Sequence, residues 1–181
     1  ILKYRVIPTP DDAAEFANAL QTRFGGDSSI MRDLTQQIIP LALADAKQAI
    51  KLVRQRATEW GIATDRVGMM GFSAGARVTA GLALDFDSAT RPDFVAPIYG
   101  ALWDEIQVPA NAPPLFIALT SDDSLALGNC LTLYSAWQKA GYPAELHIYA
   151  EAGHGFVRRV QGLPVDQWIE RFYEWLKTVV P

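Results

Sequence analysis

The feature that most constrains the fold of this chain is a serine flanked by glycines, set between an apolar run and a segment of small residues. Residues 67–70 are a short apolar run, typical of a strand buried on both faces of a sheet. Gly71-Phe72-Ser73-Ala74-Gly75 follows directly, and residues 76–84 favour a helix. Small residues two positions before and after the serine let strand and helix approach closely. The pattern therefore predicts a strand–turn–helix unit that projects the Ser73 hydroxyl.

Strands and helices are expected to alternate along most of the chain. Strands are predicted at residues 2–7, 67–70, 94–99, 115–119 and 144–149, and helices at 45–60, 76–84, 125–140 and 165–180. Residues 11–40 are mixed, with a short helix followed by a loop. Gly61 and Gly141 stand where two of the helices should end. The alternation predicts an α/β fold, a doubly wound and mostly parallel sheet with helices on both faces.

Length, charge and cysteine content narrow the function. The 181 residues suit one domain, and a net charge of −4 with no basic run longer than Arg158-Arg159 argues against a nucleic-acid partner. No apolar stretch approaches the roughly 20 residues that span a bilayer, so no membrane partner is expected. Cys130 is the only cysteine, which excludes an intrachain disulfide and a thiolate metal cluster and leaves the redox compartment open.

A serine hydroxyl needs a base to become a good nucleophile, and two histidines are available. His154 lies between two glycines in the loop after the last predicted strand, and the glycines let this loop approach another backbone. His147 lies within that strand on the same face as Glu145 and Tyr149, and we interpret it as structural. His154 is therefore the candidate base for Ser73.

An acid that orients the imidazole is expected at the carboxyl end of another strand. Asp122 and Asp123 follow the predicted strand 115–119. The order serine, acid, histidine is that of α/β-hydrolases. The aspartate pair also fits a cap for the next helix, or a cation site, although no further carboxylate or histidine lies nearby in sequence to complete one. The alternative interpretation of Ser73 is that it lies in a glycine-rich loop and has no catalytic role.

Five segments carry a family resemblance: Leu2-Lys3-Tyr4-Arg5, Asp45-Ala46, the pentapeptide around Ser73, Ser121-Asp122-Asp123 and Gly153-His154-Gly155-Phe156. They resemble the esterase/lipase branch of the α/β-hydrolases, and most of all acetyl-xylan-esterase-like carbohydrate esterases. The resemblance implies a serine esterase acting on short-chain carboxylic esters, such as acetyl groups on xylan-type carbohydrates. It favours Asp123 over Asp122 as the acid. In one small departure, Ala76 stands where the family usually has a further glycine.

The resemblance and the helix after the turn together predict a mechanism. Ser73 attacks the ester carbonyl, His154 takes its proton, Asp123 orients the imidazole and the Ala74 amide at the helix N-terminus binds the oxyanion. This chemistry requires no metal or organic cofactor. Two alternatives remain open, a serine exopeptidase of the same fold and a catalytically inactive hydrolase-like module.

The N-terminus departs from the family pattern. Residues 2–7 resemble the fourth family strand and residues 67–70 the fifth, and in the family the third strand lies between these two. The glycine-rich oxyanion loop that precedes the fourth strand is also absent from the sequence. We therefore expect residues 1–181 to be an N-terminally incomplete portion of a single catalytic domain, the sheet of which is completed by additional polypeptide. The compartment stays open for the same reason.

Overall fold

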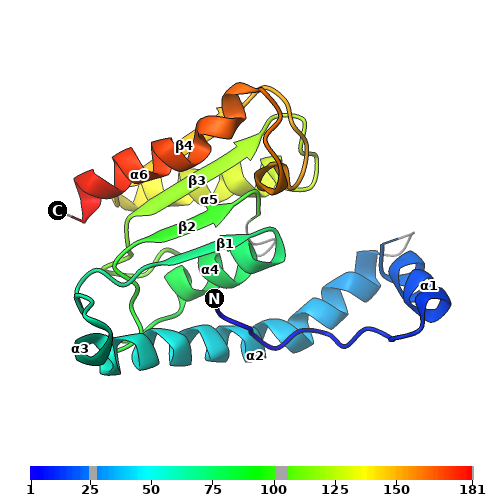
Figure 1. The fold of residues 1–181 in the computed structure, drawn as a ribbon, viewed down its shortest axis with the longest axis horizontal. Coiled ribbons are helices and arrows are strands. Elements are labelled where there is room, and N and C mark those ends of the chain that lie inside the picture. Colours follow the sequence, from blue (N-terminus) through cyan, green and yellow to red (C-terminus); the bar gives the residue numbers. More distant parts are fainter. Residues whose placement is uncertain (25–27, 101–105, 181) are drawn as a thin grey trace. The chain divides into compact units, whose positions relative to one another are not determined.

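The computed structural model describes residues 1–24, 28–100 and 106–180 (Figure 1). The chain divides into two compact units, Ile1–Ala46 and Lys47–Pro181. The first unit contains α1 (Ala13–Phe24) and the start of α2 (Ser28–Gln55). The second contains the end of α2, all the strands and the remaining helices. The expectation of one catalytic domain stays a prediction.

Within the described residues, four parallel strands form the sheet, in the order β1-β2-β3-β4. They are β1 (Met69–Phe72), β2 (Val95–Ile98), β3 (Leu115–Thr120) and β4 (Ala144–Tyr149). All the arrowheads point to one edge of the sheet (Figure 1). The register keeps the carboxyl ends together, with Phe72 paired to Ile98 and Thr120 paired to Tyr149. The predicted parallel α/β sheet is confirmed.

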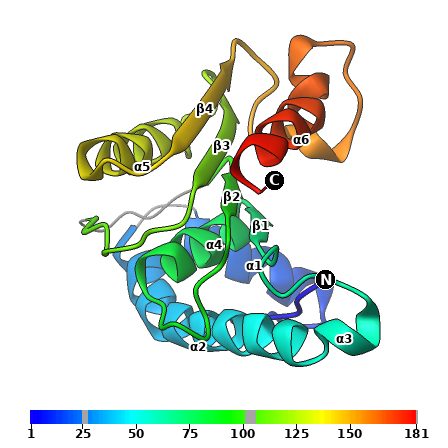
Figure 2. The ribbon, with the colours of Figure 1, turned by 90° about the vertical axis from the view of Figure 1, so that its left-hand side faces the viewer.

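Helices cover both faces of this sheet (Figure 2). On one face, α4 (Ala74–Leu84) packs on β1 and β2, and α5 (Leu127–Ala140) packs on β3 and β4. Trp137 of α5 is fully buried, and its indole N–H donates to the Pro113 carbonyl at 2.9 Å. On the other face lies α6 (Trp168–Val179), whose Phe172 and Trp175 rings lie 5.3 and 5.4 Å from Phe116 of β3.

Residues 2–7 are not a strand, so that prediction was wrong. A strand forms only where a neighbouring backbone completes the hydrogen-bond ladder, and the described residues supply no such neighbour here. The segment is held by Arg5 instead. Its guanidinium lies 2.7 Å (Nη2) from Oδ1 and 2.9 Å (Nε) from Oδ2 of Asp45, and its backbone amide donates to the same carboxylate at 2.8 Å.

The predicted loop within residues 11–40 was also wrong, because α2 already begins at Ser28 and continues through Pro40. A proline inside a helix removes one backbone hydrogen bond, and the strong helix formers after it (Leu-Ala-Leu-Ala) offset that loss.

Other boundaries differ by a few residues. The predicted helix 45–60 is interrupted at Arg56, after which α3 (Ala57–Trp60) follows as a separate turn. Gly61 (φ 65°) and Gly141 (φ 76°) end their helices in the left-handed conformation, as predicted. The first strand begins at Met69 and not at residue 67, and it is only partly buried. A short 3-10 turn, η2 (Pro164–Gln167), precedes α6.

Strand β1 pairs with β2 alone within the described residues, so its other edge is open there. The additional polypeptide expected beside it stays a prediction. In the described part of the chain, no helix combines the length and the apolar character that a bilayer crossing requires.

Candidate active site

Ser73 occupies the sharp turn between β1 and α4. Its backbone has φ 51° and ψ −114°, a region that costs a non-glycine residue about 1–3 kcal/mol. Two glycines make room for the turn. A Cβ on Gly71 would lie 2.2 Å from the Gly75 carbonyl oxygen, and one on Gly100 would lie 2.6 Å from the Ser73 carbonyl oxygen. The predicted strand–turn–helix unit is present, and close backbone packing on both sides holds the serine in its strained conformation.

Ser73, His154 and Asp123 form a continuous chain of hydrogen bonds. Ser73 Oγ lies 2.8 Å from His154 Nε2, and His154 Nδ1 lies 2.8 Å from Asp123 Oδ2. The three side chains come from the ends of β1, β3 and β4, since His154 lies in the loop between β4 and η1 (Phe156–Arg158). When Nδ1 carries the ring proton and donates it to Asp123, Nε2 is free to accept the Ser73 proton. The structure therefore brings together all three residues proposed from the sequence.

Asp123 is held rigidly. Its side chain is only 1% exposed, against 33% for His154. While Oδ2 meets the imidazole, Oδ1 accepts the backbone amides of Leu125 at 3.1 Å and Ala126 at 3.2 Å, just before α5. The same carboxylate thus binds two amides of the turn that precedes α5 and contacts the histidine, whereas no described side chain caps α5 itself.

Asp122 faces a different group. Its two carboxylate oxygens accept the backbone amides of Ala152 at 3.2 Å and Gly153 at 3.0 Å. The Thr120 hydroxyl and these two amides hold the pKa of Asp122 below its ordinary value. No cluster of three or more potential metal-ligating side chains occurs among the residues that the structure describes.

Ala74 is the first residue of α4. The first amides of a helix have no acceptor within the helix, and the positive end of the helix dipole lies there. The amides of Ala76 and Arg77 point back to the Ser73 carbonyl at 3.0 and 3.3 Å. The Ala74 amide is thus the first amide of α4, and it directly follows the serine; its role as oxyanion donor stays a prediction.

Aromatic rings line the surroundings of His154. Tyr99, at the end of β2, meets the imidazole edge-on at a centroid distance of 5.1 Å and has a strained backbone (φ 39°). Burial raises the pKa of Tyr99 above its ordinary value. Phe72, 39% exposed beside the serine, lies 5.9 Å from Trp168 at the start of α6. The contact with Tyr99 restricts how the imidazole can move.

The sequence analysis did not identify Tyr99 or Gly100 as residues of the site. Both follow β2 at the carboxyl edge of the sheet, which was the one available signal, because functional groups of parallel sheets collect at that edge. Periodicity alone does not reveal a strained tyrosine or a close backbone approach.

Two other candidate groups lie outside this cluster. His147 Nε2 lies 2.7 Å from Glu145 Oε1, and its ring lies 5.3 Å from the Phe116 ring, which fits its structural interpretation. Cys130 is fully buried, and burial raises the pKa of its thiol to about 12, so it is not a nucleophile at neutral pH.

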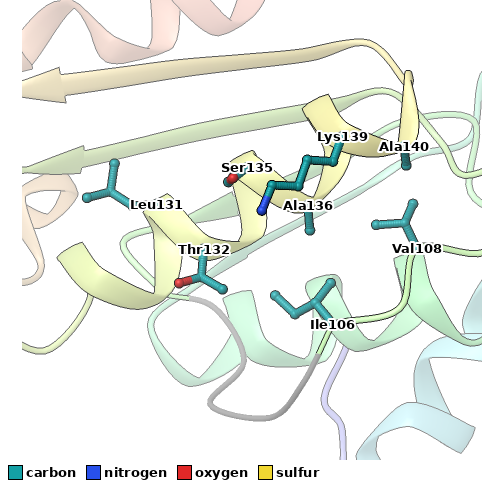
Figure 3. Close-up of a pocket in the computed structure, with 8 residues that line it drawn as sticks. All are labelled: Ile106, Val108, Leu131, Thr132, Ser135, Ala136, Lys139 and Ala140. Atoms are coloured by element: carbon teal, nitrogen blue, oxygen red, sulfur yellow. The ribbon is translucent and has the colours of Figure 1, made fainter.

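A hollow of about 720 Å³ beside α5 is lined by residues such as Ile106, Leu131 and Lys139, and by none of Ser73, Asp123 and His154 (Figure 3).

Comparison with known proteins identifies the family. Residues 16–179 match the Dienelactone hydrolase family. The chain belongs to this family. Among solved structures, the α/β-hydrolase enzyme MGS-M1 from a Medee basin deep-sea metagenome library is 26% identical with a TM-score of 0.70, and the match covers 77% of this chain and 65% of that one. This confirms the resemblance to α/β-hydrolases that the triad motifs suggested.

Two of the proteins similar to this chain have names that refer to xylan or to a xyloside. An acetylxylan esterase of Xylanibacter ruminicola is 27% identical over 172 residues, which covers 77% of this chain and 36% of that protein. The acetyl ester-xyloside bifunctional hydrolase of Caldicellulosiruptor lactoaceticus is 27% identical with a TM-score of 0.67, over 77% of this chain and 66% of that one. The chain thus spans about a third of the length of the acetylxylan esterase that it matches.

Proposed function

We propose that the protein containing this chain hydrolyses carboxylic esters through an acyl-enzyme on Ser73. The observation that carries the proposal is the continuous chain of hydrogen bonds from Ser73 Oγ through His154 to Asp123. The Asp123 side chain at its end is almost fully buried. A nucleophile, a base in contact with it and an acid that orients the base are the three groups that acyl transfer requires. Membership of the dienelactone hydrolase family supports hydrolysis as the reaction class.

The reaction proceeds in two halves. Ser73 Oγ attacks the ester carbonyl while His154 Nε2 accepts its proton, and the imidazolium then gives this proton to the leaving alcohol. Water attacks the acyl-Ser73 ester with His154 again as base, and the serine is released with the carboxylic acid. Asp123 stabilises the imidazolium in both halves, and the Ala74 amide donates to the oxyanion.

The proposed substrates are short-chain esters, and in particular acetyl groups on xylan-type carbohydrates. Support comes from the two relatives, whose names specify an acetylxylan esterase and an acetyl ester-xyloside hydrolase, each 27% identical to this chain. We propose a small-molecule or carbohydrate ester as the binding partner, and the mechanism uses neither a metal ion nor an organic cofactor.

Active-site labelling tests the nucleophile. A fluorophosphonate probe followed by peptide mapping should label Ser73 in the native protein, and Ser73→Ala should take up no label. Ser88→Ala, which removes an exposed hydroxyl from the loop after α4, is the matched control and should label as the native protein does. Labelling at another residue, or equal labelling of Ser73→Ala, would refute the proposed nucleophile.

Substrate assays test the reaction class. p-Nitrophenyl acetate and acetylated xylo-oligosaccharides should be hydrolysed, with rates that fall steeply beyond the butyrate ester. A preference for peptide amides would favour a serine exopeptidase of the same fold. Absence of turnover together with absence of labelling would favour an inactive hydrolase-like module.

A further inference from the structure

The loop that carries His154 is attached to the end of β3 by consecutive residues. The Ser121 amide donates to the Tyr149 carbonyl at 2.8 Å, and the Ser121 hydroxyl donates to the Ala150 carbonyl at 2.6 Å. One residue later, the Asp122 carboxylate accepts the amides of Ala152 and Gly153. The next residue, Asp123, meets the imidazole. Three adjacent residues, Ser121 to Asp123, thus hydrogen-bond most residues of the segment 149–154, which leads from β4 to the histidine.

Asp122 binds the two residues of this segment that have a positive φ. Ala152 has φ 150° and Gly153 has φ 69°, and a positive φ is costly for the alanine. Such a conformation persists only when surrounding contacts hold it. One carboxylate oxygen on each of the two consecutive amides is the contact present here. The Thr120 hydroxyl adds a third restraint, because it lies 3.3 Å from the Gly153 carbonyl oxygen.

The consequence concerns the imidazole. His154 directly follows Gly153, so any change in the Ala152–Gly153 backbone moves the ring relative to Ser73 and Asp123. Both ring contacts are 2.8 Å long, and proton transfer depends on this alignment. A misplacement of about 1 Å can cost about 10²-fold in rate.

From this geometry we infer that Asp122 is a positioning residue for the catalytic base, acting through the Ala152 and Gly153 amides and not by contact with substrate. The inference rests on the proposed acyl-enzyme function, and it adds a positioning residue to the residues that act directly in the mechanism. The two adjacent aspartates then have separate roles, since Asp123 orients the ring and Asp122 fixes the backbone that carries the ring.

The chain offers a matched control in Asp87. This exposed carboxylate also accepts two backbone amides, those of Ala89 and Thr90, at 2.8 and 2.9 Å, and a threonine hydroxyl at 3.0 Å. It lies in the loop after α4, and these partners, together with Lys51 at 3.8 Å, all lie outside the His154 loop. Asp87→Ala therefore removes the same kind of interaction from another place.

The test compares kcat and KM for a short p-nitrophenyl ester, together with the fluorophosphonate labelling rate. Asp122→Ala should lower kcat and the labelling rate by about 10- to 100-fold with KM changed by less than about twofold. Asp122→Asn keeps one acceptor oxygen and should lose much less. Asp87→Ala should leave all three values unchanged.

A proton NMR measurement separates failure of this inference from failure of the proposed function. The His154 Nδ1 proton, bonded to Asp123, should give a low-field resonance in the native protein and in Asp87→Ala, and it should be shifted or broadened in Asp122→Ala. An unchanged resonance and unchanged rates in Asp122→Ala would overturn the inference. If the native protein neither labels nor turns over ester, the proposed function fails, and the resonance alone then decides whether Asp122 positions the ring.

Discussion

Replacing Gly71 with alanine tests how tightly the serine turn is packed. A Cβ there would lie 2.2 Å from the Gly75 carbonyl oxygen, 2.4 Å from its carbonyl carbon and 2.5 Å from the Thr79 hydroxyl oxygen. Close carbon–oxygen contacts in proteins are about 3.3 Å long, so β1 and the first turn of α4 must separate by about 1 Å. Two of the three clashing atoms are backbone, and rotation of a side chain cannot relieve those clashes.

Two effects of known size follow from this movement. Overpacking of a well-packed interior typically costs about 1–3 kcal/mol of folding free energy. Ser73 lies between Gly71 and Gly75 and moves with them, and a shift of about 1 Å costs about 10²-fold in rate, equivalent to about 2.7 kcal/mol in the barrier. We therefore expect Gly71→Ala to lower both stability and kcat.

Urea unfolding and ester hydrolysis, measured at a temperature where the variant is fully folded, provide the assay. Gly128→Ala is the matched control, because Gly128 is the second residue of α5 and a Cβ there meets nothing within 4 Å. This control should gain about 0.5–1 kcal/mol of stability, since alanine is the better helix former, with activity unchanged. Native stability and native kcat in Gly71→Ala would show that the close packing of the turn is not what positions the serine.

Further predictions concern the acid and the buried thiol. Asp123→Asn should lower kcat by about 10²–10⁴-fold, because the amide favours the wrong imidazole tautomer, whereas Asp122→Asn should have a mild effect on kcat. Steady-state kinetics of both variants provide the measurement. If the two effects were reversed, the assignment of Asp123 as the acid would be wrong. Cys130 has a thiol pKa of about 12 and no exposed surface, so it should resist iodoacetamide at pH 8 in the native protein. It should react once the protein is unfolded in urea, as measured by intact mass. Rapid alkylation of the folded protein would contradict its burial.

Ala76 illustrates how this chain accommodates a side chain beside the serine turn. The side chain is fully buried in the first turn of α4. Gly100 lies opposite, and a Cβ there would come within 3.0 Å of the Ala76 Cβ. The absence of a side chain at Gly100 therefore makes room for both the Ala76 methyl group and the Ser73 carbonyl. A larger residue at position 100 should disturb the turn from the side opposite Gly71.

The sequence by itself determined the features that depend on neighbouring residues. Apolar periodicity located the helices of the second unit, and glycine at positions 61 and 141 marked two helix ends because the left-handed conformation is easy only for glycine. The glycines around Ser73 predicted the strand–turn–helix unit, since close approach of strand and helix requires them. Chain order then proposed His154 and Asp123 as its partners.

Only the tertiary structure decided what depends on residues far apart in the chain. Ser73 and His154 are 81 positions apart, and no local pattern specifies that their side chains lie 2.8 Å from each other. The attachment of Asp122 to the histidine loop and the contact of Tyr99 with the imidazole arise from the register of parallel strands. Residues 2–7 show the converse. Their composition favours a strand, but a strand exists only where a second backbone pairs with it, and that partner is a property of the fold and not of the segment.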